Sequence, residues 1–108
     1  MSLDPYPTVN VTRYNSQLFT CSVGSSWNSV AYFYRKNNIA LFVARGNCYD
    51  FIDQKSGLYT TYCDDSTRTF YLTINNVTDD YNGEIIQCLV YYTGNSPNKE
   101  SLINVQCK

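Results

Sequence analysis

The sequence contains no histidine, and only 16% of its 108 residues are charged. Without an imidazole there is no Ser-His or Cys-His pair, so the commonest ways of activating a nucleophile are excluded. The 8 basic and 9 acidic residues nearly cancel, which gives no reason to expect binding to nucleic acid or to an anionic membrane. We therefore expect neither an enzyme nor a nucleic-acid-binding protein, and no cofactor.

Long apolar runs are also missing. No segment approaches the roughly 18 apolar residues of a membrane span, and no secretion signal is visible. We expect residues 1–8 to be an artificial start (Met1-Ser2-Leu3) followed by an irregular lead-in. Residues 9–106 would form a single domain that does not insert into a membrane, and residues 107–108 would mark the boundary to a following domain.

Cysteine, by contrast, is abundant, with five residues in a short chain, which indicates an oxidising compartment. A zinc site would need clustered ligands, but these cysteines are scattered and no Cys-x-x-Cys motif is present. The acidic pairs Asp64-Asp65 and Asp79-Asp80 raise the possibility of calcium. Because they lack the Asp-x-Asp-x-Asp-Gly spacing, we interpret them as solvated turn residues and expect no metal site.

Two Asn-x-Thr sequons begin at Asn10 and Asn76 and agree with a secreted or cell-surface location. Eleven tyrosines suit both β-strands and binding surfaces, because tyrosine offers a large contact area at a low entropic cost.

Short apolar-polar alternations separated by polar turns run along the chain, and no helical period lasts longer than one turn. The expected strands include Val9 and Val11 and then cover residues 18–23, 30–35, 39–44, 59–62, 69–74, 86–90 and 103–107. So many short strands predict an all-β sandwich of two sheets.

The strands around two of the cysteines resemble those of the immunoglobulin superfamily. Phe-Thr-Cys-Ser-Val at 19–23 and Ile-Gln-Cys-Leu-Val at 86–90 resemble strands B and F, and their separation leaves room for C′ and C″ strands. Phe-Tyr-Arg-Lys-Asn at 33–37 resembles the strand C motif, with phenylalanine in place of tryptophan. Residues 72–83 resemble strand E and the E–F corner. The resemblance implies a Greek-key β-sandwich of the variable (V) type with C′ and C″ strands, or of the intermediate (I) type.

The departures from that pattern resemble divergent domains of invertebrate recognition and allorecognition receptors. Ile86 stands where the corner tyrosine is usual. Gly46-Asn47-Cys48 and the Tyr-x-x-x-Cys motif at 59–63 also recur in those receptors, as do Leu-Thr-Ile and Asn-Gly motifs like those within residues 72–83.

The resemblance implies disulfides Cys21–Cys88 and Cys48–Cys63, although either pair could instead be free. Cys107 would then pair with a neighbouring domain, cross-link two chains or remain a free thiol. An ion pair between Arg68 and Asp80 is also implied. The expected core residues are Phe19, Phe33, Leu72, Ile74 and Ile86.

A binding face follows from the period-two alternation. If Cys88 and Phe33 face the core, their neighbours point outward and form a tyrosine-rich surface of the kind that marks a partner site. Its expected members are Tyr32, Tyr34, Phe42, Leu89, Tyr91 and Leu102. A slip of one residue in strand C would turn Tyr32 and Tyr34 inward. Glycans on Asn10 and Asn76 are expected to leave this face free.

The resulting hypothesis is an extracellular domain of a single-pass cell-surface protein that mediates recognition or adhesion. Its partner would be a protein, and a second copy of the chain is one candidate. One alternative is an immune-type binder of foreign glycans or proteins, or a viral immunoglobulin-like glycoprotein domain, and another is a spacer without a ligand.

Overall fold

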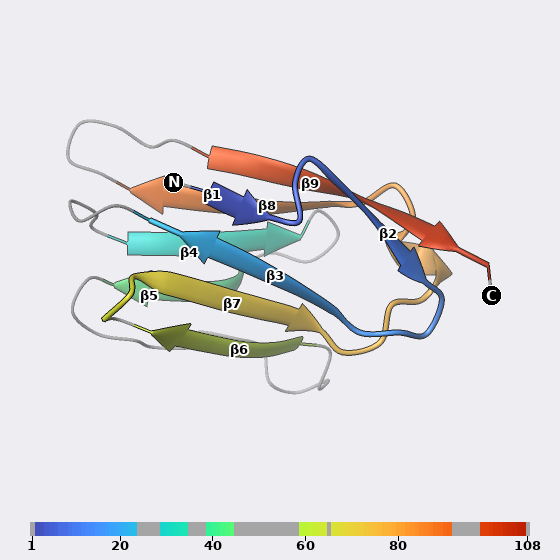
Figure 1. Cartoon of the computed structure of the whole chain (residues 1–108), viewed down its shortest axis with the longest axis horizontal. Coiled ribbons are helices and arrows are strands. Elements are labelled where there is room, and N and C mark those ends of the chain that lie inside the picture. The colour runs from blue at the N-terminus through green and yellow to red at the C-terminus, as the bar shows by residue number, and fades with distance from the viewer. Residues whose placement is uncertain are drawn as a thin grey trace.

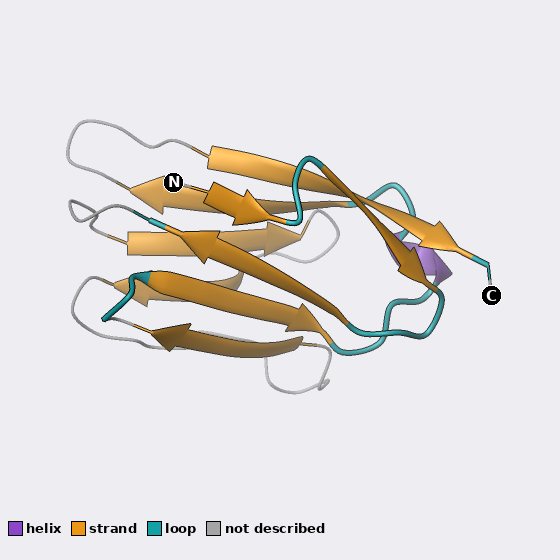
Figure 2. Cartoon of the chain, viewed as in Figure 1, coloured by secondary structure: helices purple, strands orange, loops and turns teal. Residues whose placement is uncertain are grey.

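The computed structural model describes residues 2–23, 29–34, 39–44, 59–64, 66–91 and 98–107, and at 29–34, 39–44, 61, 63 and 91 the description is of the backbone. The strands are β1 (Ser2–Asp4), β2 (Thr8–Thr12), β3 (Gln17–Ser22), β4 (Ser29–Tyr34), β5 (Ile39–Ala44), β6 (Tyr59–Asp64), β7 (Thr69–Ile74), β8 (Ile85–Tyr91) and β9 (Asn98–Gln106). A short 3-10 helix, η2 (Asp79–Tyr81), follows β7. Figure 2 shows that strands dominate the described chain.

The described strands form two sheets that face each other (Figure 1). One sheet has the order β1-β3-β7-β6 and the other the order β2-β9-β8-β4-β5. The pairings are antiparallel except that of β2 with β9, which is parallel. The sandwich predicted from the alternating pattern is therefore present.

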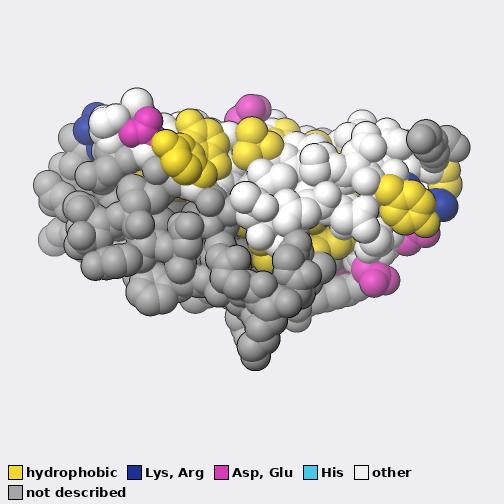
Figure 3. Space-filling model, turned by 90° about the horizontal axis from the view of Figure 1, so that it is seen from below, with side chains coloured by type: hydrophobic (Ala, Val, Ile, Leu, Met, Phe, Trp, Pro, Cys, Tyr) yellow, Lys and Arg dark blue, Asp and Glu magenta, His cyan; other side chains and the backbone are white. Residues whose placement is uncertain are grey.

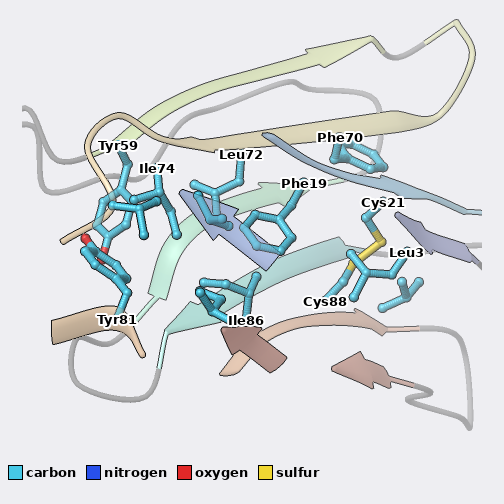
Figure 4. Close-up of a cluster of buried hydrophobic side chains, with 14 of the residues drawn as sticks. Leu3, Phe19, Cys21, Tyr59, Phe70, Leu72, Ile74, Tyr81, Ile86 and Cys88 are labelled. Atoms are coloured by element: carbon cyan, nitrogen blue, oxygen red, sulfur yellow. A yellow bond between two sulfur atoms is a disulfide. The ribbon is translucent and has the colours of Figure 1, made fainter. Parts of the chain in front are cut away.

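The core lies between the sheets, where the inward positions of β3, β7 and β8 meet (Figure 4). Phe19, Leu72, Ile74 and Ile86, all expected in the core, have 0% of their surface exposed. The disulfide Cys21–Cys88, with its Cα atoms 6.5 Å apart, joins β3 of one sheet to β8 of the other. It therefore cross-links the two layers through their centre.

The N-terminal segment differs from the expected irregular lead-in. Residues 2–4 form β1, which pairs with β3, and Leu3 is buried with 5% exposure. After the prolines at positions 5 and 7 the chain continues as β2 in the other sheet. Proline cannot donate a ladder hydrogen bond, so it suits the point where a strand leaves one sheet. Residues 2–4 are thus part of the sandwich.

The strand expected at 39–44 is present as β5, at the edge of the five-stranded sheet. A following C″ strand would fall within residues 45–58, outside the described residues. In the described part of the chain, no helix is long and apolar enough to span a membrane.

Candidate recognition surface

In the five-stranded sheet the structure describes the side chains of β2, β9 and β8 up to Val90, and β9 and β8 lie side by side between β2 and β4. On β8 the buried Ile86, Cys88 and Val90 alternate with partly exposed residues, and on β9 Ser101 and Ile103 do the same. Alternation therefore sends the remaining side chains away from the core. We call this surface the outer face; its described members on these two strands are Ile85, Gln87, Leu89, Asn98, Glu100, Leu102, Asn104 and Gln106.

The outer face is organised in rows across the two strands. Ile85 pairs with Leu102, and Leu89 with Asn98. Between these rows the Gln87 amide donates a hydrogen bond to the Glu100 carboxylate, Nε2 to Oε2, at 3.4 Å. The surface combines apolar side chains with amides and carries little charge, a composition common at protein interfaces.

The register of β4 reverses the expected sides of its aromatic residues. Tyr32 pairs with Cys88 and Tyr34 with Ile86, whereas Phe33 pairs with the outer-face residue Gln87. Residues directly opposite each other lie on the same side of a sheet. By these pairings positions 32 and 34 share rows with core residues and position 33 with an outer-face residue, so the backbone register of β4 differs by one residue from the register expected for Tyr32, Tyr34 and Phe33. Alternation could not decide, because residues 30–34 are apolar or aromatic at every position.

The structure describes the other expected members of the binding face to different extents. Phe42 pairs with Ala31, which itself pairs with Leu89, so position 42 lies in an outer row. Leu89 and Leu102 are partly exposed on the outer face. For Tyr91 the structure gives only the pairing with Ser29. Apolar residue types thus continue from β9 across the sheet to β5.

A charged cluster lies where β9 ends. Arg13, in the turn after β2, forms an ion pair with Asp79 at 2.9 Å. Its Nη2 also donates to the Cys107 sulfur at 3.2 Å, and Cys107 is an exposed free thiol. The Asp79 carboxylate raises the pKa of Arg13, and Cys107 has a smaller effect in the same direction. This cluster ties the turn after β2 to the E–F corner.

The prediction of an ion pair between Arg68 and Asp80 is wrong. Arg68 immediately precedes β7 and Asp80 follows it, so a strand of 6 residues separates them. Such a strand is about 20 Å long. Arg68 instead stands in the turn before β7 with φ 54°, and its carbonyl accepts a hydrogen bond from the Val23 amide. The aspartate at the corner that pairs with an arginine is Asp79, through Arg13.

Asp64, considered above for calcium, serves the turn between β6 and β7. Its carboxylate accepts hydrogen bonds from the Ser66 hydroxyl at 2.6 Å and the Ser66 amide at 3.1 Å. These hydrogen bonds lower the pKa of Asp64, and the bond from the Ser66 hydroxyl has the largest effect. Asp65 lies outside the described residues, within which no group of acidic or cysteine side chains is arranged to hold a metal ion.

The pairing Cys48–Cys63 stays a prediction. Cys48 lies outside the described residues. For Cys63 the structure gives only the backbone pairing with Phe70.

Two buried tyrosines were missed by the sequence analysis. Tyr81 in η2 is 6% exposed and Tyr59 on β6 is 8% exposed. Burial raises the pKa of the Tyr81 phenol, and the nearby Tyr59 has a smaller effect in the same direction. Tyr81 could have been found from the sequence, because it is a tyrosine between Asp79-Asp80 and Asn82-Gly83. The sequence analysis considered the corner tyrosine only at position 86.

The opposite side of the sandwich also carries exposed apolar side chains. On the four-stranded sheet Leu18 and Tyr62 are 47% and 63% exposed. Tyr62 stacks at a tilt on Tyr71, with 5.7 Å between ring centroids, while threonines face outward at 60 and 73. Figure 3, which views the molecule along the edge at β6, shows the described hydrophobic side chains of that edge in separate groups.

Comparison with known proteins identifies the fold. No family model and no curated protein matches the sequence. Solved structures do match, among them a chain of titin A168–A169 at a TM-score of 0.68 and 17% identity. The match covers 93% of this chain and 44% of that titin chain, so this chain spans less than half of its length.

The two sheets, the disulfide between them and this likeness define an immunoglobulin-like β-sandwich. Domains of this fold generally have no catalytic activity, and the disulfide fits an extracellular domain. Because 1241 chains of solved structures match, the fold by itself does not specify a partner.

Proposed function

We propose that this chain is a recognition domain of a cell-surface protein and binds another protein through the outer face. The observation that carries the proposal is the row structure of that face, in which Ile85, Leu89 and Leu102 are partly exposed beside amide side chains. Apolar side chains kept at a sheet surface contribute nothing to the core, but they stabilise a complex when a partner covers them.

The shape of the surface favours a protein over a small molecule. Small ligands bind in concave pockets that enclose most of their surface. The face of a sheet is broad, and it suits a second surface of similar extent. Glu100 is the charged residue among the described members of the outer face, and Gln87 holds its carboxylate. Two copies of the chain meeting here would therefore bring few like charges together, which favours self-recognition.

The test is bead aggregation with the full chain produced through the secretory pathway. Beads coated with the chain should clump with one another and not with beads that carry unrelated immunoglobulin-like domains. Leu89→Arg places a charge in the outer face and should abolish the clumping. Leu18→Arg, at an exposed position of the other sheet, is the matched control and should leave it unchanged. Both variants should unfold at the wild-type temperature, because neither side chain belongs to the buried core.

Two other results have clear meanings. Clumping that survives Leu89→Arg would refute the outer face as the site. If wild-type beads do not clump, a panel of purified ectodomains should yield a partner whose binding Leu89→Arg removes; no partner in that panel would favour a spacer role.

A further inference from the structure

The two sequons share one pattern of side-chain burial. In each, a buried valine separates an exposed asparagine from a partly exposed threonine: Val11 is 3% exposed and Val77 0%. Asn10 and Thr12 lie on β2, whereas Asn76 and Thr78 lie between β7 and η2. The asparagine amide and the threonine hydroxyl, the groups recognised when a glycan is attached, are therefore on the surface at both sites.

The two sites differ in what surrounds them. β2 is the edge strand of the five-stranded sheet, and Asn10 pairs in parallel with Asn104. Because Val9 and Val11 turn toward the core, Asn10 points to the same side as Asn104, onto the outer face. Asn10 therefore lies on the outer face, whereas the sequence analysis expected a glycan on Asn10 to leave this face free. Asn76 precedes Val77, which exchanges backbone hydrogen bonds with Tyr14 and Asn15, and lies at the E–F corner.

We propose that Asn10 carries an N-linked glycan that covers one end of the outer face and confines partner contact to the other end. The second half of this inference rests on the function proposed above. The glycan would stand beside Asn104, two residues or about 7 Å along β9 from Leu102. Asn98, which pairs with Leu89, is six residues or about 20 Å from Asn104. The end near Leu89 would remain open, while the Ile85–Leu102 row would lie under the sugar.

The attachment step is a glycosyl transfer. The Asn10 side-chain nitrogen forms a bond to C1 of the first sugar of a lipid-diphosphate-linked oligosaccharide. The bond between that carbon and the diphosphate oxygen breaks, the lipid diphosphate leaves with the bonding electrons, and the amide nitrogen loses one proton. No oxidation or reduction takes place.

Occupancy is tested on the full chain secreted from a eukaryotic cell, by mapping glycopeptides. Thr12→Ala should remove the glycan from Asn10 and leave that on Asn76. Thr12→Ser keeps an acceptor sequon and should retain both glycans, which separates loss of the acceptor from damage to β2. An unmodified Asn10 in the wild-type chain would overturn the inference.

The position of the glycan is tested without any partner. In a Cys107→Ser background, Asn104→Cys and Asn98→Cys each add one thiol on the same face of the same strand, and the Cys107→Ser protein itself measures the labelling of any other thiol. We expect a bulky maleimide to label position 104 more slowly than in the same protein carrying Thr12→Ala. Position 98 should be labelled at the same rate with and without Thr12→Ala. Equal rates at position 104 would show that the glycan does not cover this end.

The binding assay then separates the two proposals. If a partner binds, Leu102→Arg should weaken binding less in the glycosylated chain than in the chain carrying Thr12→Ala, whereas Leu89→Arg should abolish binding by both chains. An equal loss with Leu102→Arg in the two chains would contradict the confinement. If no partner is found but the labelling at position 104 depends on Thr12, the glycan shield stands and the proposed recognition role fails.

Discussion

Tyr81 of η2 and Tyr59 of β6 bring their phenol oxygens together at one end of the core (Figure 4). Tyr59 comes from the β6–β7 hairpin, and Tyr81 comes from the E–F corner. A side-chain hydrogen bond joins the two residues. Both rings are almost fully buried. The corner is thus attached to the four-stranded sheet by a polar contact that is shielded from water.

This arrangement predicts a loss of stability at alkaline pH. Burial raises the folded-state pKa of Tyr81 above that of a free phenol, which is about 10. Above pH of about 10 the unfolded chain therefore releases a proton that the folded chain retains, so the free energy of unfolding falls as the pH rises. Tyr81→Phe removes this proton, and urea denaturation at increasing pH should show a shallower decline than in the wild type.

Tyr62→Phe is the matched control for that measurement, because Tyr62 is 63% exposed. It should leave the alkaline decline unchanged. An identical decline in Tyr81→Phe and wild-type protein would mean that the Tyr81 phenol is not protected from ionisation in the folded domain.

A second prediction concerns the Cys21–Cys88 disulfide, which closes a loop with a sequence separation of 67. In the loop-entropy model a closure of this length stabilises the folded state by about 4 kcal/mol. The double variant Cys21→Ala/Cys88→Ala should lose at least roughly that amount, because truncating buried side chains also leaves a cavity. Guanidinium denaturation measures the difference.

Cys107→Ser provides the comparison for the double variant, since Cys107 is exposed and outside the core. Its free energy of unfolding should stay within about 0.5 kcal/mol of the wild type. A double variant as stable as Cys107→Ser would show that the cross-link between the sheets contributes little.

Much of the fold was predictable because one side of most strands is apolar and the other polar. In β7 the residues Phe70, Leu72 and Ile74 alternate with Tyr71 and Thr73, so the inward side is unambiguous, and each of the first three is fully buried. The inter-sheet disulfide was implied by the resemblance of β3 and β8 to immunoglobulin strands B and F, and it is present between Cys21 and Cys88. Patterning of this kind is enough to specify a sandwich.

The binding face was less predictable, because β4 lacks such a difference between its sides. A shift of one residue exchanges every side chain of a strand between core and surface. In β4 the pairing of Tyr32 with Cys88 decides the sides, and this long-range contact is not encoded in the local pattern. The position of Asn10 was missed for a similar reason: only the pairing of β2 with β9 shows to which sheet the sequon belongs.

The last prediction concerns Ser101, a polar residue on the inward side of β9. It is 0% exposed, pairs with the buried Ile86, and its hydroxyl oxygen has no hydrogen-bond partner in the described part of the chain. A buried hydroxyl without a partner costs about 1–3 kcal/mol, because it gives up hydrogen bonds to water. Ser101→Ala should therefore raise the free energy of unfolding by about 1 kcal/mol, unlike most substitutions in a core.

Ser22→Ala, at a partly exposed position of β3, tests whether alanine itself changes strand stability. It should shift the free energy of unfolding by less than about 0.5 kcal/mol. If Ser101→Ala destabilises the domain instead, the hydroxyl must form a hydrogen bond in the folded protein, and a buried water molecule is then the simplest partner. A Ser101→Ala variant with a higher free energy of unfolding would show that Ser101 lowers the stability of the wild-type domain.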